Sequence, residues 1–204
     1  MIFMCSRGRR ESLARFFDES KPSLPGRVLI DSDDKSYADF TLPTGWEFIV
    51  GPRAPTQVII NRAFKEYPNE PWYGLVCDDM VFGPFGWDEV LAKAAGKHHI
   101  AWGNDGRWGP KLCTSFFVGG DLVRLYGWLA HPAFGHLYVD SVWWMIAKGA
   151  NLARYHPEIR ATHYNAKDQT YKERAIRGDQ GAFDELRKEA IPDLTRLAVE
   201  FSKC

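Results

Sequence analysis

Short apolar runs separated by turn residues dominate the first half of the chain. They are bounded by Gly, Pro, Asp or Ser and predict buried strands over Met1–Cys5, Val28–Ile30, Phe48–Val50 and Gly74–Cys77. Helical spacing of apolar residues predicts helices after Arg10, over Pro55–Tyr67, and from an N-cap at Asp88 to Ala95. This alternation predicts an α/β fold with a mostly parallel, Rossmann-like sheet flanked by helices.

The pattern changes after Gly96. Further apolar runs predict strands at His99–Trp102, Leu112–Val118, Leu152–His156 and Arg160–Tyr164. We expect one helix capped by Asp121 and another that is opened by His136–Asp140 and ended by Gly149. The rest of the chain is polar with helical spacing, and Pro192 suits the first turn of a last helix.

This organisation predicts one α/β domain over residues 1–165 and a helical C-terminal extension over residues 166–204. A length of 204 residues with 45% hydrophobic residues suits that division and provides a sizeable core. The 26 basic residues balance the 26 acidic ones, so no overall field attracts nucleic acid or an acidic membrane, although a local basic patch stays open.

The cysteines and the apolar segments indicate the compartment. Cys5, Cys77, Cys113 and Cys204 are widely spaced without a CxxC, which argues against a zinc knuckle or a disulfide framework. Cys77 and Cys113 sit in apolar runs and are expected to be small core residues. No segment approaches the roughly 20 apolar residues of a membrane span, and the short N-terminal apolar stretch is not a signal peptide. We expect a cytoplasmic protein without a membrane span.

Paired carboxylates follow one predicted strand directly. Asp78 and Asp79 come after the run Gly74–Cys77, and ligands of open α/β sheets bind at the carboxyl ends of strands. Two adjacent carboxylates need a cation or a hydrogen-bonded partner there. A site for Mg²⁺ or Mn²⁺ that serves a phosphorylated substrate meets that need. The alternative is a solvated turn, where Asp is common.

Two other strand ends carry polar residues that suit a nucleotide. Ser6-Arg7-Gly8-Arg9 follows the first strand and opens a helix, which is a favourable place for phosphate or base contacts. Asp31-Ser32-Asp33-Asp34 follows the second strand, where one Asp could accept hydrogen bonds from a base or a ribose. A solvated basic turn is the alternative for the first of these segments.

Taken in order, these motifs resemble a nucleotide-sugar glycosyltransferase of the GT-A fold, near the family 2 type. The resemblance covers about residues 1–165 and combines Ser6–Arg9, the Asp31–Asp34 cluster, the Asp78-Asp79 pair, Gly119-Gly120 and Asp140. It implies a hexosyltransferase with a nucleotide-binding half over about 1–97 and an acceptor half over about 98–165. The implied cofactor is Mn²⁺ or Mg²⁺, and the implied donor is a nucleotide sugar, most commonly a UDP-sugar.

The resemblance also implies roles for single residues near the donor. Asp79 would touch the metal and Asp78 the ribose or sugar hydroxyls, although Cys77 stands where many relatives carry another Asp. Ser6, Arg7 and Arg9 match the loop that meets the nucleotide. One of three acids would contact the base: Asp31, Asp33 or Asp34.

Further matched positions lie later in the chain. Gly119-Gly120 matches a small-residue turn beside the sugar pocket. Asp140 matches the general base of inverting members, and His163 stands where metal-dependent relatives supply a third ligand. Simpler interpretations are a helix N-cap for Asp140 and an ordinary hydrogen-bonded side chain for His163. The remaining histidines are expected to be structural or at the surface: His98, His99, His131, His136 and His156.

Two other functions fit parts of the pattern. A nucleotidyltransferase shares the α/β sheet and paired acids, but it needs a Gly-rich loop followed by Lys, which SRGRRES lacks. A non-catalytic module that binds nucleotide sugars would keep Ser6–Arg9 and Asp78-Asp79 but would need no base, so Asp140→Asn would leave its function intact.

The acceptor is the least defined part of the prediction. The compact chain resembles small stand-alone transferases, including bacteriophage enzymes that glycosylate modified bases in DNA. Basic residues in the last third could meet DNA phosphates: Arg154, Arg160, Lys167, Lys172, Arg174 and Arg177. A solvated helix face is the simpler explanation, because acidic residues lie among them. Polysaccharide, lipid-linked and protein acceptors stay open.

Overall fold

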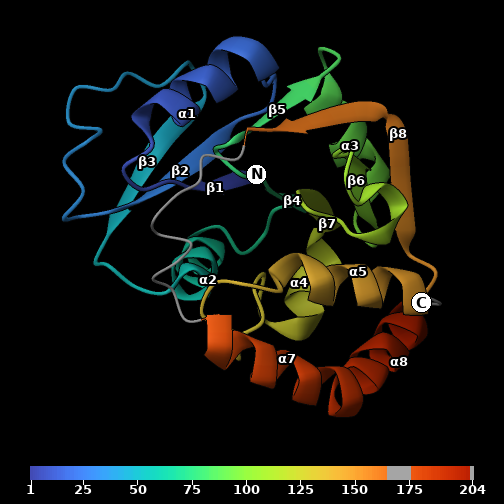
Figure 1. Cartoon of the computed structure of the whole chain (residues 1–204). Coiled ribbons are helices and arrows are strands. Elements are labelled where there is room, and N and C mark those ends of the chain that lie inside the picture. Colours follow the sequence, from blue (N-terminus) through green and yellow to red (C-terminus); the bar gives the residue numbers. More distant parts are fainter. Residues whose placement is uncertain (165–175, 203–204) are drawn as a thin grey trace.

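Eight strands form one mixed sheet in the computed structural model, which describes residues 1–164 and 176–202 (Figure 1). The sheet order is β3-β2-β1-β4-β7-β6-β8-β5. The strands are β1 (Ile2–Cys5), β2 (Gly26–Asp31), β3 (Trp46–Gly51), β4 (Trp72–Leu75), β5 (Met80–Gly83), β6 (Ile100–Asn104), β7 (Phe116–Gly119) and β8 (Ala153–His163). Strands β1 to β4 pair in parallel, as the alternating pattern predicts.

The other half of the sheet supplies the mixed character. Strand β7 runs antiparallel to both β4 and β6, and β8 pairs in parallel with β6 and antiparallel with β5. The expected α/β fold with a mostly parallel sheet, flanking helices and C-terminal helices is confirmed, with antiparallel pairing confined to this half.

Helices cover both faces of the sheet. The helices are α1 (Arg10–Arg15), α2 (Thr56–Glu66), α3 (Trp87–Ala95), α4 (Gly120–Tyr126), α5 (Val139–Gly149), α7 (Ile176–Glu189) and α8 (Ile191–Phe201). Period-two alternation in β1 shows the two layers: Ile2 and Met4 pack with α1 and α3, whereas Phe3 packs with α2, α4 and α5. Strand β1 is therefore buried on both faces, which explains why its sequence is an uninterrupted apolar run.

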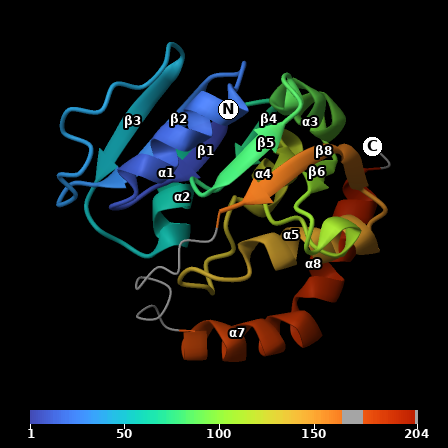
Figure 2. The same cartoon turned by 45° about the horizontal axis from the view of Figure 1, so that its top comes forward.

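The C-terminal helices extend the second of these layers. Both views show α7 and then α8 at the periphery, with α8 next to α5 (Figure 1, Figure 2). Pro192 lies in the first turn of α8, as its missing N–H predicts. None of the helices in the described part of the chain is long and apolar enough to cross a membrane.

Strand β8 corrects two of the predicted strands. Leu152–His156 and Arg160–Tyr164 are parts of one strand, which passes Pro157 at an irregularity in its pairing with β6. The register jumps there, from Gly103 opposite His156 to Asn104 opposite Arg160. Proline is tolerated at such a break because it lacks the N–H that a regular ladder requires.

Strand β5 was not predicted. Its four residues follow Asp79 immediately and precede the turn at Pro84 and Gly86, so the segment looks like a loop in the sequence. It forms because β8 pairs with it from far along the chain.

The predicted caps at Asp88 and Asp121 are also wrong. Helix α3 begins at Trp87 after a left-handed Gly86, and the buried carboxylate of Asp88 accepts a hydrogen bond from the N–H of Leu24. Helix α4 begins at Gly120, and Asp121 instead contacts His98 and Arg124.

Candidate functional site

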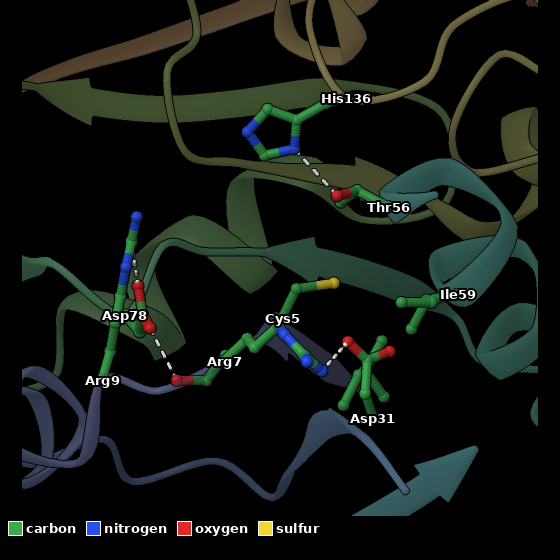
Figure 3. A pocket seen from close by; sticks show the side chains of 10 residues that line it. Cys5, Arg7, Arg9, Asp31, Thr56, Ile59, Asp78 and His136 are labelled. Carbon is green, nitrogen blue, oxygen red and sulfur yellow. Dashed lines mark hydrogen bonds and ion pairs between the residues drawn. The ribbon is translucent and has the colours of Figure 1, made fainter. Parts of the chain in front are cut away.

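Three polar segments meet at one edge of the sheet because β2, β1 and β4 are parallel neighbours. The carboxyl end of β1 leads into Ser6–Arg9, that of β2 into Asp31–Asp34 and that of β4 into Cys77–Asp79. A pocket opens between these segments and α2, as the sheet topology predicts (Figure 3). Its lining residues are Cys5, Ser6, Arg7, Arg9, Leu29, Asp31, Thr56, Ile59, Asp78 and His136.

Asp78 is the most enclosed acid of the pocket, with 3% of its side chain exposed. The hydroxyl of Ser6 donates to Asp78 Oδ2 at 2.6 Å, and Arg9 Nη1 donates to Asp78 Oδ1 at 2.9 Å. Because Ser6 gives its one proton to Asp78, the Tyr37 hydroxyl, 2.6 Å from Ser6 Oγ, donates to Ser6. Tyr37 in turn accepts the backbone N–H of Arg9 at 3.0 Å, so this chain of bonds locks the first loop onto Asp78.

Asp79 faces a different partner. Its Oδ2 lies 3.1 Å from Nε2 of His163 and 3.6 Å from Nη1 of Arg9. The register of β5 and β8 explains the first contact, because Met80 pairs with His163 and the N–H of Tyr164 donates to the Asp79 carbonyl at 2.8 Å. Residues that are distant in sequence thus form one carboxylate–imidazole pair.

The surroundings shift the pKa values of Asp78 and Asp79 in opposite directions. Burial raises the pKa of Asp78 above its ordinary value, although Arg9 and Ser6 act against it. Burial also acts to raise the pKa of Asp79, but the hydrogen bond and charge of His163, together with Arg9, outweigh it and hold this pKa low. The hydrogen bond to Asp79 raises the pKa of His163. Asp79 is therefore the acid of the pair that ionises first.

Arg7 and Asp31 line the other end of the pocket, and Asp33 contacts Arg7 there. Arg7 Nη1 donates to Asp31 Oδ2 at 2.7 Å and to Asp33 Oδ1 at 2.6 Å. Asp31 is only 4% exposed, and its Oδ1 has no hydrogen-bond partner in the described part of the chain. Asp34 accepts the N–H of Gly8 and so ties the second strand end to the first. A buried carboxylate oxygen without a donor is costly unless a ligand supplies one.

Asp140 lies in the first turn of α5, two residues past the N-cap position. Tyr138 occupies the N-cap position in a left-handed conformation, and Asp140 Oδ1 accepts the N–H of the following Ser141 at 2.7 Å. Burial raises the pKa of Asp140 to about 6, with Asp105 adding to the effect. A carboxyl group with a pKa near neutrality suits a general base.

Cys77 corrects one expectation about the core. It is exposed, whereas Cys113 is buried as predicted. The thiol of Cys77 is nevertheless crowded by protein, and this desolvation, followed by the charges of Asp79, Asp78 and Asp140, raises its pKa. All three acids therefore share one neighbourhood around an accessible Cys77.

Gly119 and Gly120 are not brought to this neighbourhood. Gly119 pairs with Trp72 at the start of β4, the opposite end from Asp78 and Asp79. A Cβ on Gly119 would lie 2.1 Å from backbone atoms of Lys97, and one on Gly120 would lie 2.0 Å from the Glu70 carbonyl oxygen. Close packing of backbones accounts for both glycines without a sugar pocket.

Four residues of the site escaped the sequence analysis: Tyr37, Thr56, Ile59 and His136. His136, which was expected to be structural or at the surface, lines the pocket with its Nδ1 2.8 Å from Thr56 Oγ1 (Figure 3). Its position next to the predicted helix that carries Asp140 was the available signal. Nothing in the mixed segment around Tyr37 marked it.

A divalent ion fits Asp79 and His163 but would need further ligands. Carboxylate oxygen with imidazole nitrogen suits Mn²⁺ better than Mg²⁺, which prefers oxygen alone. Within residues 1–164 and 176–202, no group of three or more His, Cys, Asp or Glu side chains is arranged to hold an ion. Oxygens of a bound diphosphate and water would therefore complete the coordination.

The sequence matches no family model and no curated protein. Solved structures do match. A mannosyltransferase from Pyrobaculum calidifontis in complex with GDP-Man and Mn²⁺ has a TM-score of 0.59 and 11% identity, over 98% of this chain and 72% of that one. Glucosyl-3-phosphoglycerate synthase from Mycobacterium tuberculosis, with Mn²⁺, UDP and phosphoglyceric acid, has a TM-score of 0.61 and 12% identity, over 94% of this chain and 78% of that one.

A third match is a glucose-1-phosphate thymidylyltransferase from Bacillus anthracis, with 9% identity over 76% of this chain and 85% of that one. Its TM-score of 0.49 is too low to support an argument. The two higher-scoring structures are neither bacteriophage proteins nor DNA-modifying enzymes by their descriptions, so they give no support to a phage origin. At these identities the similarity establishes the fold: the chain has the α/β architecture of GT-A glycosyltransferases.

Proposed function

We propose that the chain is a metal-dependent glycosyltransferase that moves a sugar from a nucleotide diphosphate, first of all a UDP-sugar, to an acceptor hydroxyl. The observation that carries the proposal is the arrangement at the edge of the sheet. An ionised Asp79 paired with His163 lies next to a pocket that holds basic side chains and a buried carboxylate oxygen to which no group among the described residues donates. The fold shared with two Mn²⁺-containing glycosyltransferase structures supports it.

Asp31 suits the base of the nucleotide. Its Oδ1 can only accept a hydrogen bond when the group is ionised, and uracil presents an N–H donor. Arg7 holds Asp31 through Oδ2 and leaves Oδ1 for the ligand. Ile59 from α2 offers an apolar surface at the same end of the pocket, against which a flat base can pack (Figure 3).

Arg9 and Ser6 suit the diphosphate end. Arg9 reaches both acids of the pair, so its charge lies where a leaving diphosphate would gather negative charge. Asp79 and His163 would hold Mn²⁺, which, when bound, would neutralise the charge on the diphosphate oxygens. The Asp79–His163 contact of 3.1 Å would open as both side chains turn to such an ion.

Asp140 is the proposed base. The acceptor oxygen attacks the anomeric carbon, the bond from that carbon to the phosphate oxygen breaks, and the diphosphate leaves with the electron pair. The acceptor proton passes to the Asp140 carboxylate, which needs hydrogen-bond reach of about 2.6–3.2 Å. This displacement inverts the anomeric centre. The pKa of about 6 for Asp140 lets the group be ionised at neutral pH and still basic enough to take the proton.

Calorimetric titration tests the donor site. We expect UDP-glucose or GDP-mannose to bind the full chain with Mn²⁺ present and at least about tenfold more weakly with chelator. Asp79→Ala is expected to abolish the metal-dependent part. The matched control is Asp193→Ala, which removes an exposed acid of α8 that forms an ion pair with neighbouring Arg196. Absence of nucleotide-sugar binding with metal, or equal loss in both variants, would contradict the proposal.

Only Asp140 distinguishes the proposed glycosyltransferase from the alternative of a non-catalytic binding module. A binding module needs no base, so Asp140→Asn would leave its function unchanged. The raised pKa of Asp140, which burial produces beside the acid pair, favours catalysis over mere binding.

The acceptor stays a prediction at the level of a hydroxyl group. Of the basic residues proposed to meet DNA, Lys167, Lys172 and Arg174 lie outside the described residues.

A further inference from the structure

The segment Gly135–Asp140 links the pocket to the proposed base. His136 lines the pocket, and Asp140 stands in the first turn of α5 shortly after it. The segment before Val139 has no regular secondary structure of its own. The positions of His136 and Asp140 therefore depend on whatever satisfies the backbone of this short stretch.

Asp179 of α7 satisfies that backbone. Its Oδ1 accepts the N–H of Gly135 at 2.7 Å, and its Oδ2 accepts those of His136 at 2.9 Å and Leu137 at 2.8 Å. The carboxylate is buried, with 6% exposed. These backbone bonds outweigh burial and hold the pKa of Asp179 below its ordinary value. Three successive amides aimed at one carboxylate form a strong, charge-assisted anchor.

The pocket side holds the same segment through α2. The N–H of Thr56 donates to the Gly135 carbonyl at 3.0 Å, and Thr56 Oγ1 contacts His136 Nδ1. On the other side, the ring of Tyr138 stacks on Phe183 of α7, with centroids 4.3 Å apart and planes 13° apart. The segment is thus clamped between an edge of the proposed nucleotide pocket and the C-terminal extension.

We infer that α7 is part of the donor site: Asp179 positions His136 as a side chain that contacts the bound nucleotide. The inference rests on the proposed function and deepens it. It also gives the C-terminal extension, which lies beyond the sequence motifs of residues 1–165, a role in substrate binding. Asp179 is a positioning residue that acts through His136, and His136 is the residue that meets the ligand.

A double-mutant cycle on the full chain tests this role. UDP is titrated with Mn²⁺ into wild type, Asp179→Asn, His136→Ala and the double variant. Each single variant is expected to bind UDP about tenfold more weakly. Asn at position 179 cannot accept all three N–H bonds, and His136→Ala removes the side chain that meets the ligand. The double variant is expected to match the single ones instead of losing about a hundredfold, since the two residues act as one unit. Asp184→Asn, an exposed acid of the same helix, is the matched control.

Amide hydrogen exchange gives a readout that does not depend on the ligand. In Asp179→Asn, the amides of Gly135, His136 and Leu137 should exchange faster, while those of β1 should not change. A general loss of stability would instead speed exchange throughout. If Asp179→Asn does not fold, Asp179→Glu keeps the charge, displaces the oxygens by one methylene and takes its place in the cycle.

The outcomes separate this inference from the function on which it rests. If wild type binds no nucleotide, the proposed function fails and the inference falls with it. If wild type binds but Asp179→Asn binds equally well, or if the two losses simply add, only the inference is overturned. Equal weakening by Asp184→Asn would also overturn it, because a charge change anywhere on α7 would then suffice.

Discussion

The pocket at the strand ends and the adjoining segment Gly135–Asp140 differ in how their side chains are held. In the pocket, the functional side chains follow strand ends directly and bind one another: Ser6 and Arg9 bind Asp78, and Arg7 binds Asp31. In the segment, the backbone is held instead, by Asp179 from α7 and by Thr56 from α2. Short sequence motifs encode the arrangement in the pocket, whereas the arrangement of the segment depends on elements far apart in the sequence.

The comparison suggests a division of labour. Side chains that hold each other by charge stay poised for a charged ligand, because a nucleotide can replace one partner with its own groups. A segment held by its backbone instead presents a side chain to the pocket, as it does with His136. Substitutions in the pocket should therefore weaken binding directly, whereas substitutions that loosen the segment should act through the positions of His136 and Asp140, on binding and on turnover respectively.

Asp140→Asn should give the largest effect. Loss of the base is expected to slow release of nucleoside diphosphate from the donor by about 10²–10⁴-fold, while UDP affinity stays within about twofold. Steady-state kinetics beside calorimetry measures the two quantities. Full activity in this variant would remove Asp140 from the chemistry and favour the binding-module alternative.

Asp31→Asn should test whether the pocket binds the base of the nucleotide through Asp31. The substitution offers a mixed donor and acceptor in place of a carboxylate, so we expect UDP to bind about 10–100-fold more weakly. Inorganic pyrophosphate with Mn²⁺, which lacks a base, should bind as it does to wild type. Equal weakening of both ligands would show that Asp31 acts by supporting Arg7 and not by contacting the base.

Gly120→Ala should separate packing from ligand binding. Its added Cβ would lie 2.0 Å from the Glu70 carbonyl oxygen, so unfolding should become easier by about 1–3 kcal/mol. Gly181→Ala is a control of opposite sign, because it adds a methyl group in open space on α7 and should stabilise by about 0.5–1 kcal/mol. Urea unfolding measures both. A change in UDP affinity for folded Gly120→Ala would restore the predicted role beside the sugar pocket.

The pH dependence of turnover should report Asp140. With a pKa of about 6, the base is protonated below that pH, so the rate should fall about tenfold per pH unit there and level off above it. The residual rate of Asp140→Asn should lack this limb. A profile without an inflection near pH 6 in wild type would argue against a carboxyl base with this pKa.

The free energy of unfolding should show the smallest effect, and its pH dependence should be opposite to that of turnover: it should fall as the pH rises. Because the folded-state pKa of Asp140 lies above its ordinary value of 3.8, the folded protein binds this proton more tightly between those two pH values. Ionised Asp140 therefore costs stability above about pH 6. Asp140→Asn should be more stable than wild type at pH 8, and this advantage should shrink at pH 4, as urea unfolding at both pH values would show.

The strand ends explain how much could be predicted from the sequence. Buried parallel strands produce continuous apolar runs, so β1, β2 and β4 and the polar segments after them were visible, and topology then brought them together. The roles assigned to these residues stay predictions. The pairing of Asp79 with His163 agrees in position with the resemblance, but it arises from a β5–β8 register that the runs do not encode.

Tertiary contacts explain what the sequence did not reveal. Strand β5 and the single long β8 exist because they pair with each other and because β8 also pairs with β6, so local propensity gave no warning of either. Cys77 follows an apolar run but lies past the end of β4, where the chain turns to the surface. His136 and Tyr37 enter the site from irregular segments, which carry no periodicity to interpret.

Strand β8 has a consequence for the order in which the protein assembles. Its last residue, His163, meets Asp79 only after β8 has paired with both β6 and β5, and such non-local pairing is slow because the intervening chain must first be ordered. Strands β1 to β4 and the ion pairs at their ends need only the first part of the chain. During synthesis a nascent protein would thus form the ion pairs at the ends of β1, β2 and β4 early and its acid–imidazole pair late.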